Sequence, residues 1–566
     1  TGTGAVNINA GAGAITLDNA ANNFVGVVNL INTGANNIAI ADVNALTLSG
    51  VNMTATAAGR LSVTAGTGIS QTGAINTGTG AGAINANAGA IALENAGNNF
   101  RGSLSLNNTG ANNIAIRTAG PLSLSGVSMT NFEAGGLTVT SNGELTQTGA
   151  ISTGTGVSAL NSGNGAIILT NTGNIFGREV RFTNTGASNN VTIVNSGNLV
   201  LGTSSTAGAL NLTATSLRQT RGITAGNTTL TISAAGGDID LSTQVNSLGQ
   251  VTIGNDGGQA ANVRDFRLSN ARVGAGAIVN LSNIGTTNLR DVSVQYIGAS
   301  YNIPTLTMAS LRDVNFLSNG ALTQAVGGIR NSGSATFVAV ATNNVITLTD
   351  ANNNFGGAVT LTNTGAHNIA IRDINALNLA GVSMSPGSSG GLSVNTGGDI
   401  TQTGAIVTGT GGSVFNAGGG GSIMLTNTNN NFVGAVSLSV IANGNIAIRD
   451  ANNLVLSNVG MSATNAGTFT VTNNGALTQA AGTRIITGTG AVAINAGAGA
   501  ITLNNTDNNF AGATSLTNTG ANNIVIRDVG VGCEHDDHGG GWLDREHWRC
   551  DHADGCHRHG YGCLGV

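Results

Sequence analysis

The chain has 566 residues, of which 88 are glycine, 3 are proline, 3% are aromatic and 8% are charged, whereas about 25% of an ordinary soluble domain is charged. This composition is too apolar for a disordered chain and too polar for a membrane-spanning run of about 18 residues, and its glycines do not follow the every-third-residue rule of collagen. A net charge of −5 gives no basic surface for nucleic acid, so we predict neither a nucleic-acid partner nor a membrane span.

The sequence repeats itself from its first residues onward. NTGANNIAI at 32–40 returns at 108–116, and variants of it occupy 363–371 and 518–526. A phenylalanine marks each of seven units, at a spacing of about 76–90 residues: Phe24, Phe100, Phe176, Phe266, Phe355, Phe432 and Phe510. A glutamine follows most of them at a fixed distance, at Gln71, Gln147, Gln402 and Gln479, and Gln219 and Gln324 are displaced variants. Seven such units indicate a repeat architecture.

Short stretches within each unit alternate apolar and polar residues. Examples are AITLD, NIAIADV, ALTLSGV and RLSVTAG, separated by turns rich in Gly, Asn and Thr. This alternation is typical of half-buried strands, and apolar anchors about eight residues apart predict coils of about 19–25 residues, three to four per unit.

These features predict an all-β fold, a single long right-handed parallel β-helix. Stacked coils about 4.8 Å apart would give roughly 25 coils and a length on the order of 120 Å. A β-propeller or a string of small β-sandwiches is the alternative, but both need larger cores with more aromatic residues.

The unit GAGAITLDNAANNFVGVVNLINTGANNIAI and the segment GGLSVNTGGDITQTGAIVTGTG resemble the β-strand repeats of filamentous-haemagglutinin-like adhesins, which bacteria export by two-partner secretion. The resemblance covers residues 1–532. It implies a secreted or cell-surface location, an outer-membrane transporter as export partner, and contact with host cells, matrix or carbohydrate through regions outside this chain.

The repeat domain is expected to be a fragment. Residues 1–17 match residues 487–503 at all but one position, so the chain begins inside a repeat, without a signal peptide or the capping segment that solenoids need.

The composition changes abruptly at residue 533. Residues 533–566 hold all four Cys, both Trp and six of the seven His. One interpretation is a zinc site built from thiolates and imidazoles, although the Cys spacing is wider than in the usual metal-binding knuckles. The candidate ligands would be Cys550, Cys556, Cys563, His557 and His559.

We favour a frameshift instead, and therefore predict no metal site. Read one nucleotide forward, each Cys becomes Ala or Val and each Trp becomes Gly. With suitable codons, residues 533–557 can be read as ANTTTTAAGGLIANTGAAITQTGAI, which resembles VNMTATAAGRLSVTAGTGISQTGAI at 51–75. We therefore expect coils to end near residue 530 and the tail to lack a specific fold.

No catalytic arrangement stands out in residues 1–532. Acid–base chemistry on a polysaccharide needs clustered carboxylates, whereas the charged residues here are spread along the chain. The recurrent Arg–Asp pair at Arg372–Asp373, 449–450 and 527–528 is interpreted as a solvated charge ladder at a corner. We predict no enzyme activity and no cofactor.

The least regular stretch, about 262–330, is the one candidate binding region. Its arginines and tyrosines could hold an acidic or sugar-like ligand by charge and stacking, although drift or a surface loop is the commoner explanation. The candidate residues are Arg264, Arg267, Arg272, Arg290, Tyr296, Tyr301 and Arg312.

The sequence thus predicts a non-catalytic structural stalk segment of a secreted or surface-attached bacterial adhesin. The alternatives are a carbohydrate-binding or carbohydrate-cleaving β-helix with its site in 262–330, and a flat-faced solenoid that binds ice or another surface.

Overall fold

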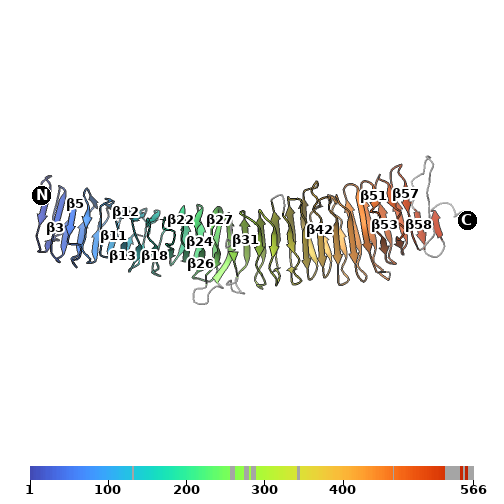
Figure 1. The fold of residues 1–566 in the computed structure, drawn as a ribbon, viewed down its shortest axis with the longest axis horizontal. Helices are drawn as coiled ribbons and strands as arrows, with labels where there is room; N and C mark the ends of the chain where they lie inside the picture. Colours follow the sequence, from blue (N-terminus) through green and yellow to red (C-terminus); the bar gives the residue numbers. More distant parts are fainter. Residues whose placement is uncertain are drawn as a thin grey trace. The chain divides into compact units, whose positions relative to one another are not determined.

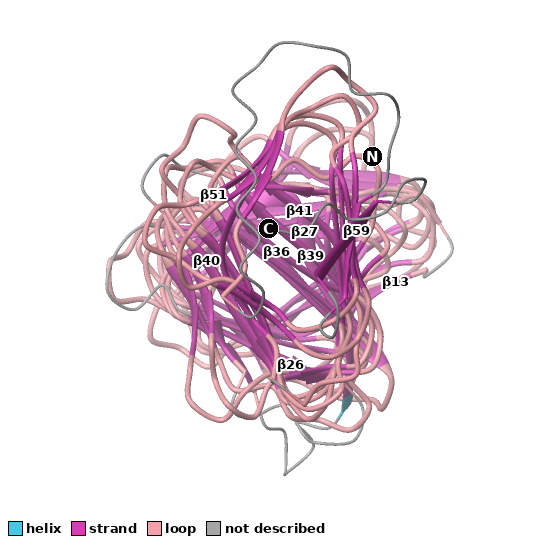
Figure 2. Cartoon of the chain, turned by 90° about the vertical axis from the view of Figure 1, so that its right-hand side faces the viewer, coloured by secondary structure: helices cyan, strands magenta, loops and turns pink. Residues whose placement is uncertain are grey.

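The protein is an all-β parallel solenoid of about 21 turns, which confirms the predicted fold class with somewhat fewer coils than expected. A computed structural model describes residues 1–130, 133–254, 262–272, 279–281, 289–340, 344–462, 464–529, 548–551 and 555–558. These residues form strands and loops and contain no α-helix; the short cyan piece in Figure 2 is a 3₁₀ turn. They divide into two compact units, Thr1–Leu289 and Arg290–Val566.

In the first unit, each strand pairs in parallel with the strand on the next coil. Ile15 in β2 (Ile15–Leu17) pairs with Ile38 in β4 (Ile38–Asp42), and Ile38 pairs with Leu61 in β6 (Leu61–Ala65). Each step is about 23 residues long, within the range of solenoid coils. The second unit repeats this step, since Ile346, Ile369 and Leu392 pair in succession. Figure 1 follows the strands of each unit in chain order.

The core is thin because most strands bury only alternate residues. In β6, Leu61, Val63 and Ala65 are buried while the Ser and Thr between them are half-buried. Side chains of a strand alternate between its two faces, so the apolar set of each coil points inward and stacks on the next. Val, Ile, Leu and Ala fill most of this core, as the composition predicted.

Each coil has three sides. After β4, the chain forms β5 (Ala45–Met53), whose register shifts beside Gly50. The first half of β5 pairs with β7 (Gly68–Gln71), and the second half pairs with β8 (Ile75–Asn76). One coil therefore contributes β4 and the two halves of β5 to three different stacks.

Successive sequence repeats do not return to the same side. A repeat of about 76 residues and a step of about 23 residues give about 3.3 coils per repeat, so each repeat moves the pattern by about one side. Copies of the NTGANNIAI strand accordingly lie in three stacks: β4 between β2 and β6, β12 (Ile114–Thr118) between β10 (Ala90–Leu93) and β14 (Leu137–Ser141), and β20 (Val191–Val194) between β18 (Ile167–Leu169) and β23 (Leu210–Ala214).

Near the end of the second unit the pairing changes direction. β57 (Ile524–Ile526) is parallel to β54 (Ile501–Leu503). β58 (Trp548–Asp551) is instead antiparallel to β56 (Thr514–Thr517), and β59 (Gly555–Arg558) is antiparallel to β58. Parallel stacking is thus last seen at β57, close to the predicted position.

The candidate zinc ligands are only partly within the described chain. Cys563 and His559 lie outside the described residues, and for Cys550, Cys556 and His557 only the backbone is described. The frameshift and the alternative metal site both stay predictions.

Candidate functional site

In five repeats a fully buried asparagine stands two residues before the marker phenylalanine, at Asn98, Asn174, Asn353, Asn430 and Asn508. Asn430, before Phe432, has no exposed surface. Its Oδ1 accepts hydrogen bonds from the Ile406 backbone N–H at 2.9 Å and from the Gln402 amide at 2.8 Å. Its Nδ2 donates to Gln402 Oε1 at 2.8 Å and to the Leu425 carbonyl at 3.1 Å. One side chain thus satisfies polar groups from several positions along neighbouring coils.

The recurrent glutamine is the partner of this asparagine. Gln402 also donates to the Gly404 carbonyl at 2.6 Å. A Cβ on Gly404 would lie 1.7 Å from the Ala380 carbonyl oxygen, so glycine is required where the two coils approach. The same amide pair recurs as Gln71–Asn98, Gln147–Asn174, Gln219–Asn246, Gln324–Asn353 and Gln479–Asn508. Sequence reasoning found the glutamines but missed their partners, although the asparagine two residues before each Phe was the available signal.

A polar side chain 18 residues after the phenylalanine completes the corner. Asp450 accepts from the Phe432 backbone N–H at 2.7 Å and from the Asn452 N–H at 2.7 Å. Asp42 and Asp373 do the same for Phe24 and Phe355. We call the Gln–Asn pair, the phenylalanine and this polar acceptor the corner clasp.

The corner clasp corrects the interpretation of the Arg–Asp pairs. Asp373 and Asp450 are 1% and 0% exposed, so the acidic half of these two pairs is not part of a solvated ladder, whereas Asp528 is half-buried. Asp373 and Asp450 face inward because each binds two backbone N–H groups that would otherwise be buried without partners. The Arg372 side chain is exposed, as predicted.

The buried aspartates give the solenoid a defined pH response. Burial raises the pKa of Asp450 above its ordinary value of 3.8, and the hydrogen bonds from Phe432 and Asn452 oppose this shift. The folded state therefore binds the proton more tightly than the unfolded chain. Stability from this group is present below the ordinary pKa of 3.8 and is lost as pH rises through the raised pKa.

In urea unfolding between pH 3 and 7, we expect the stability of the wild-type chain relative to Asp450→Asn to increase as the pH falls, because the folded state favours the protonated aspartic acid. Asparagine is compatible with the position, since Asn195 accepts from the Phe176 N–H at 2.9 Å. A wild-type advantage that shrinks on acidification would contradict the prediction.

One marker residue was assigned wrongly. In the fourth repeat, Asn246 pairs with Gln219, and the residue two positions later is Leu248, whose N–H is bound by Asn270 Oδ1 at 2.9 Å. Leu248 therefore takes the place of the phenylalanine. Phe266 lies inside β29 (Val263–Asn270), opposite Ile239, and only happens to fall at a similar spacing.

Three of the predicted binding residues belong to the first unit, where each has a partner within the protein. Arg264 makes two hydrogen bonds with Asp238, at 3.0 and 2.6 Å. Arg267 lies 3.2 Å from Asp265. Arg272 donates to the Ala225 carbonyl. The ion pairs are partly exposed, so each adds little stability.

The other four belong to the second unit. Arg290 and Arg312 both bind the carboxylate of Asp291, at 3.1 and 2.8 Å. Tyr296 and Tyr301 are only 3% and 2% exposed. Their rings lie in an inward row, in which Tyr301 stacks on Phe316 with centroids 5.9 Å apart. The structure thus places both tyrosines in the core, where they cannot stack on a ligand at the surface.

The hydroxyl of Tyr301 is buried and has no hydrogen-bond partner among the residues that the structure describes. An unsatisfied buried hydroxyl costs about 1–3 kcal/mol. We therefore expect Tyr301→Phe to raise the free energy of unfolding by about that amount, measured by urea unfolding of the full chain. A loss of stability would show that the hydroxyl has a partner in solution.

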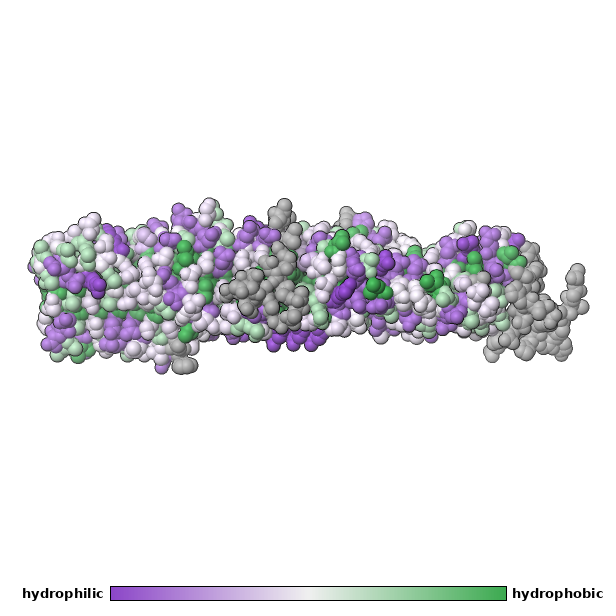
Figure 3. All heavy atoms as spheres, turned by 90° about the horizontal axis from the view of Figure 1, so that it is seen from below, coloured by the Kyte–Doolittle hydropathy of each residue, from purple (hydrophilic) through white to green (hydrophobic). Residues whose placement is uncertain are grey.

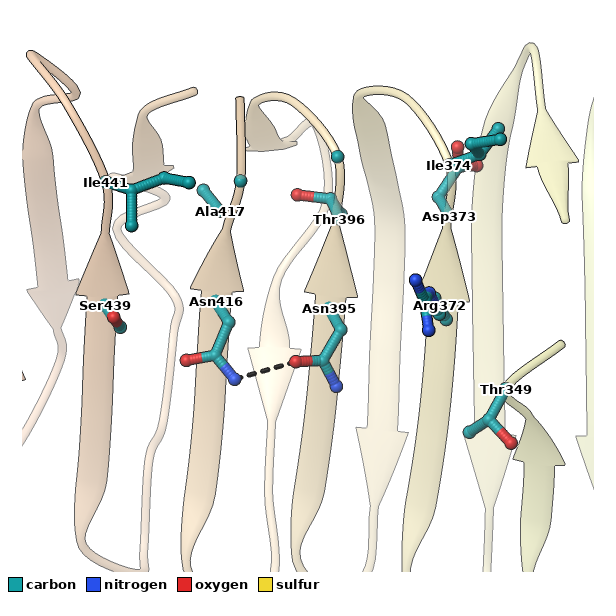
Figure 4. Close-up of a pocket in the computed structure, with 12 residues that line it drawn as sticks. Thr349, Arg372, Asp373, Ile374, Asn395, Thr396, Asn416, Ala417, Ser439 and Ile441 are labelled. Carbon is teal, nitrogen blue, oxygen red and sulfur yellow. Dashed lines mark hydrogen bonds between the residues drawn. The ribbon is translucent and has the colours of Figure 1, made fainter. Parts of the chain in front are cut away.

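A groove lies on one side of the second unit (Figure 4). Its volume is about 630 Å³. The outward side chains of Arg372, Asn395, Asn416 and Ser439 stand in a row on four consecutive coils, and Asn416 donates to Asn395 Oδ1 at 2.7 Å. Ile374 and Ile441 rise beyond the strand ends at either end of this row.

Among the described residues, no three His, Cys, Asp or Glu side chains gather as a metal ion would require. Hydrophobic residues on the face drawn in Figure 3 lie among weakly polar ones. No helix in the described part of the chain has the length and apolar character of a membrane span.

The repeats match a known protein family. A family model described as repeats of unknown function, DUF5649, matches residues 1–31, 35–107, 111–183, 188–255, 289–362, 366–439 and 443–517. These segments cover most of the chain. The chain belongs to the DUF5649 repeat family.

Each full-length DUF5649 match contains one complete Gln–Asn pair of the corner clasp. The match at 366–439, for example, holds Gln402, Asn430 and Phe432, while the acceptor Asp450 belongs to the next match at 443–517. The amide pair therefore closes one DUF5649 repeat, and the acceptor joins it to the next. Neither a curated protein nor a solved structure matched this chain.

Proposed function

We propose that this chain is a non-catalytic structural stalk segment of a secreted or cell-surface bacterial adhesin. The observation that carries the proposal is the corner clasp. The residues that recur from repeat to repeat, namely Gln, the buried Asn, the Phe and its acceptor, bind other parts of the solenoid. Selection for a repeated scaffold accounts for such a pattern, because each repeat must hold its neighbours and need not present a ligand site.

The location and partners in this proposal come from the resemblance to filamentous-haemagglutinin-like adhesins. An outer-membrane transporter would export the protein, and regions outside this chain would contact the host cell, matrix or carbohydrate. The stalk would hold those regions away from the cell, without a cofactor.

Deleting one repeat from the encoded protein in its own bacterium tests the stalk. Removal of residues 366–442 takes out one whole repeat and joins equivalent positions. The deletion should preserve surface display, detected with an antibody against the chain, and bring the distal end closer to the cell by about 16 Å, which corresponds to about 3.3 coils of about 4.8 Å. Fluorescence interference measurements on a distal tag would detect the change.

The matched control is a full-length protein carrying Asn429→Ala, an exposed substitution within the deleted segment. It should leave both display and height unchanged. Absence of the chain from the cell surface would contradict the proposal. Cleavage of a polysaccharide by the purified chain, or glycan binding that depends on the 262–330 region, would establish the carbohydrate-directed alternative instead.

A further inference from the structure

The groove beside Arg372 runs across four consecutive coils of the second unit. From β40 (Ile369–Asp373) through β42 (Leu392–Thr396) and β45 (Ser413–Ala417) to β47 (Val436–Val440) there are three coil steps, or about 14 Å at about 4.8 Å each. Gly397 and Gly418 line the groove between the two isoleucines. Because these two glycines have no side chains, the side chains of Ile374 and Ile441 remain uncovered and are 48% and 57% exposed.

Arg372 carries an exposed guanidinium group whose donors contact no acceptor among the described residues. Asp350 lies close enough for an electrostatic attraction, but neither it nor Asp373 contacts the guanidinium. Asp373 accepts from Phe355 and Asn375, and Asp350 accepts from the backbone N–H groups of Asn352 and Gly327. The guanidinium donors therefore remain available to a ligand.

The groove also lies where the repeat departs from its own pattern. Asn363 is fully buried, and its side chain binds the Gly365 N–H and the His367 carbonyl. Val440, at the equivalent position of the next repeat, is apolar and cannot make these bonds. The following loop exposes Ile441 and holds Ala442 at a φ of 57°. A left-handed alanine costs free energy, and in a scaffold built from repeats such a local exception indicates a local role.

We propose that this groove binds an extended peptide segment in which an acidic side chain lies between apolar residues. The carboxylate would meet Arg372, the peptide backbone would meet the amides of Asn395 and Asn416, and apolar side chains would cover Ile374 and Ile441. A groove of about 14 Å accommodates about four extended residues. No aromatic ring lines the groove, which favours a peptide over a sugar, because sugars are commonly held against ring faces.

The test uses the full chain and two labelled, capped pentapeptides that alternate leucine with glutamate or with glutamine. Fluorescence anisotropy should show the acidic peptide binding at least about tenfold more tightly than the neutral one. Arg372→Gln should abolish that difference, and Ile441→Ser should weaken both peptides. Arg117→Gln is the matched control, since Arg117 occupies the equivalent exposed position of another repeat and should leave binding unchanged.

Equal affinity for the two peptides, or a charge preference that survives Arg372→Gln, would overturn the proposal. Displacement of the acidic peptide by a glucuronate oligosaccharide at lower concentration than by the unlabelled peptide would assign the groove to acidic sugars and overturn it as well. Thermal unfolding should be the same for wild type and Arg372→Gln, because the side chain is exposed. The proposed stalk function does not depend on this groove, so either can fail without the other.

Discussion

Asn430→Ala should lower the stability of the coils around it by about 3–5 kcal/mol. The substitution leaves the buried Ile406 N–H and Leu425 carbonyl without their partners, at about 1–3 kcal/mol for each unsatisfied group. It also removes the two hydrogen bonds that the Gln402 amide makes with Asn430. Because coils contact mainly their neighbours, the loss should be local.

Hydrogen exchange read by mass spectrometry resolves such a local effect. Peptides covering residues 400–450 should lose protection by more than about a hundredfold, since each step of about 1.4 kcal/mol corresponds to a factor of ten. Asn429→Ala is the control, because Asn429 is the adjacent asparagine and is exposed. Equal exchange in the two variants would show that the corner clasp does not hold the coils together.

Phe432→Ala should cost a comparable amount, about 3–5 kcal/mol, because it opens a cavity in a thin core. The ring is 1% exposed and meets Phe415 edge-on, with centroids 6.0 Å apart. Few other side chains can move into the space, because the neighbouring strands are fixed by their backbone pairing. Limited proteolysis in increasing urea should show earlier cleavage within residues 400–450.

Phe432→Leu separates the effect of losing buried volume from the effect of losing the aromatic ring. Leu248 occupies the equivalent place in the fourth repeat, with its own Asn and Gln partners. The leucine variant should therefore lose only about 1.5 kcal/mol. Equal sensitivity of the alanine and leucine variants would mean that the aromatic ring itself, rather than filled volume, stabilises the corner.

Much of the architecture followed from periodicity alone. Strict alternation in segments such as Leu61–Ala65 fixes which residues point inward, and small aliphatic side chains suit a narrow core. The seven units and the parallel stacking were predicted for these reasons. The phenylalanines were predicted only as markers of the units.

The polar interior was harder to predict. Asparagine side chains are usually exposed. Burial of Asn430 is favourable only because its hydrogen-bond partners lie 24 and 28 residues earlier, at Ile406 and Gln402. The sequence alone indicates a surface charge at Asp450, because nothing in its own strand reveals the Phe432 N–H that it binds. Likewise, Tyr301 was assigned to a surface site, yet its neighbours along the coil axis, such as Phe316, place it in the core.

The rotation of about one side per repeat has a consequence for how such a gene can change length. Unequal recombination between two copies removes or adds a whole repeat and joins equivalent codons, so the strand after the junction meets a neighbour like its original one. In the second unit, Ile446 stacks on Ile423 as Ile369 stacks on Ile346, and the two pairs are one repeat apart. The product gains or loses about 3.3 coils and turns all later surfaces by about a third of a revolution. Length can therefore vary between lineages without a folding penalty, while the direction in which any surface feature points is reset each time.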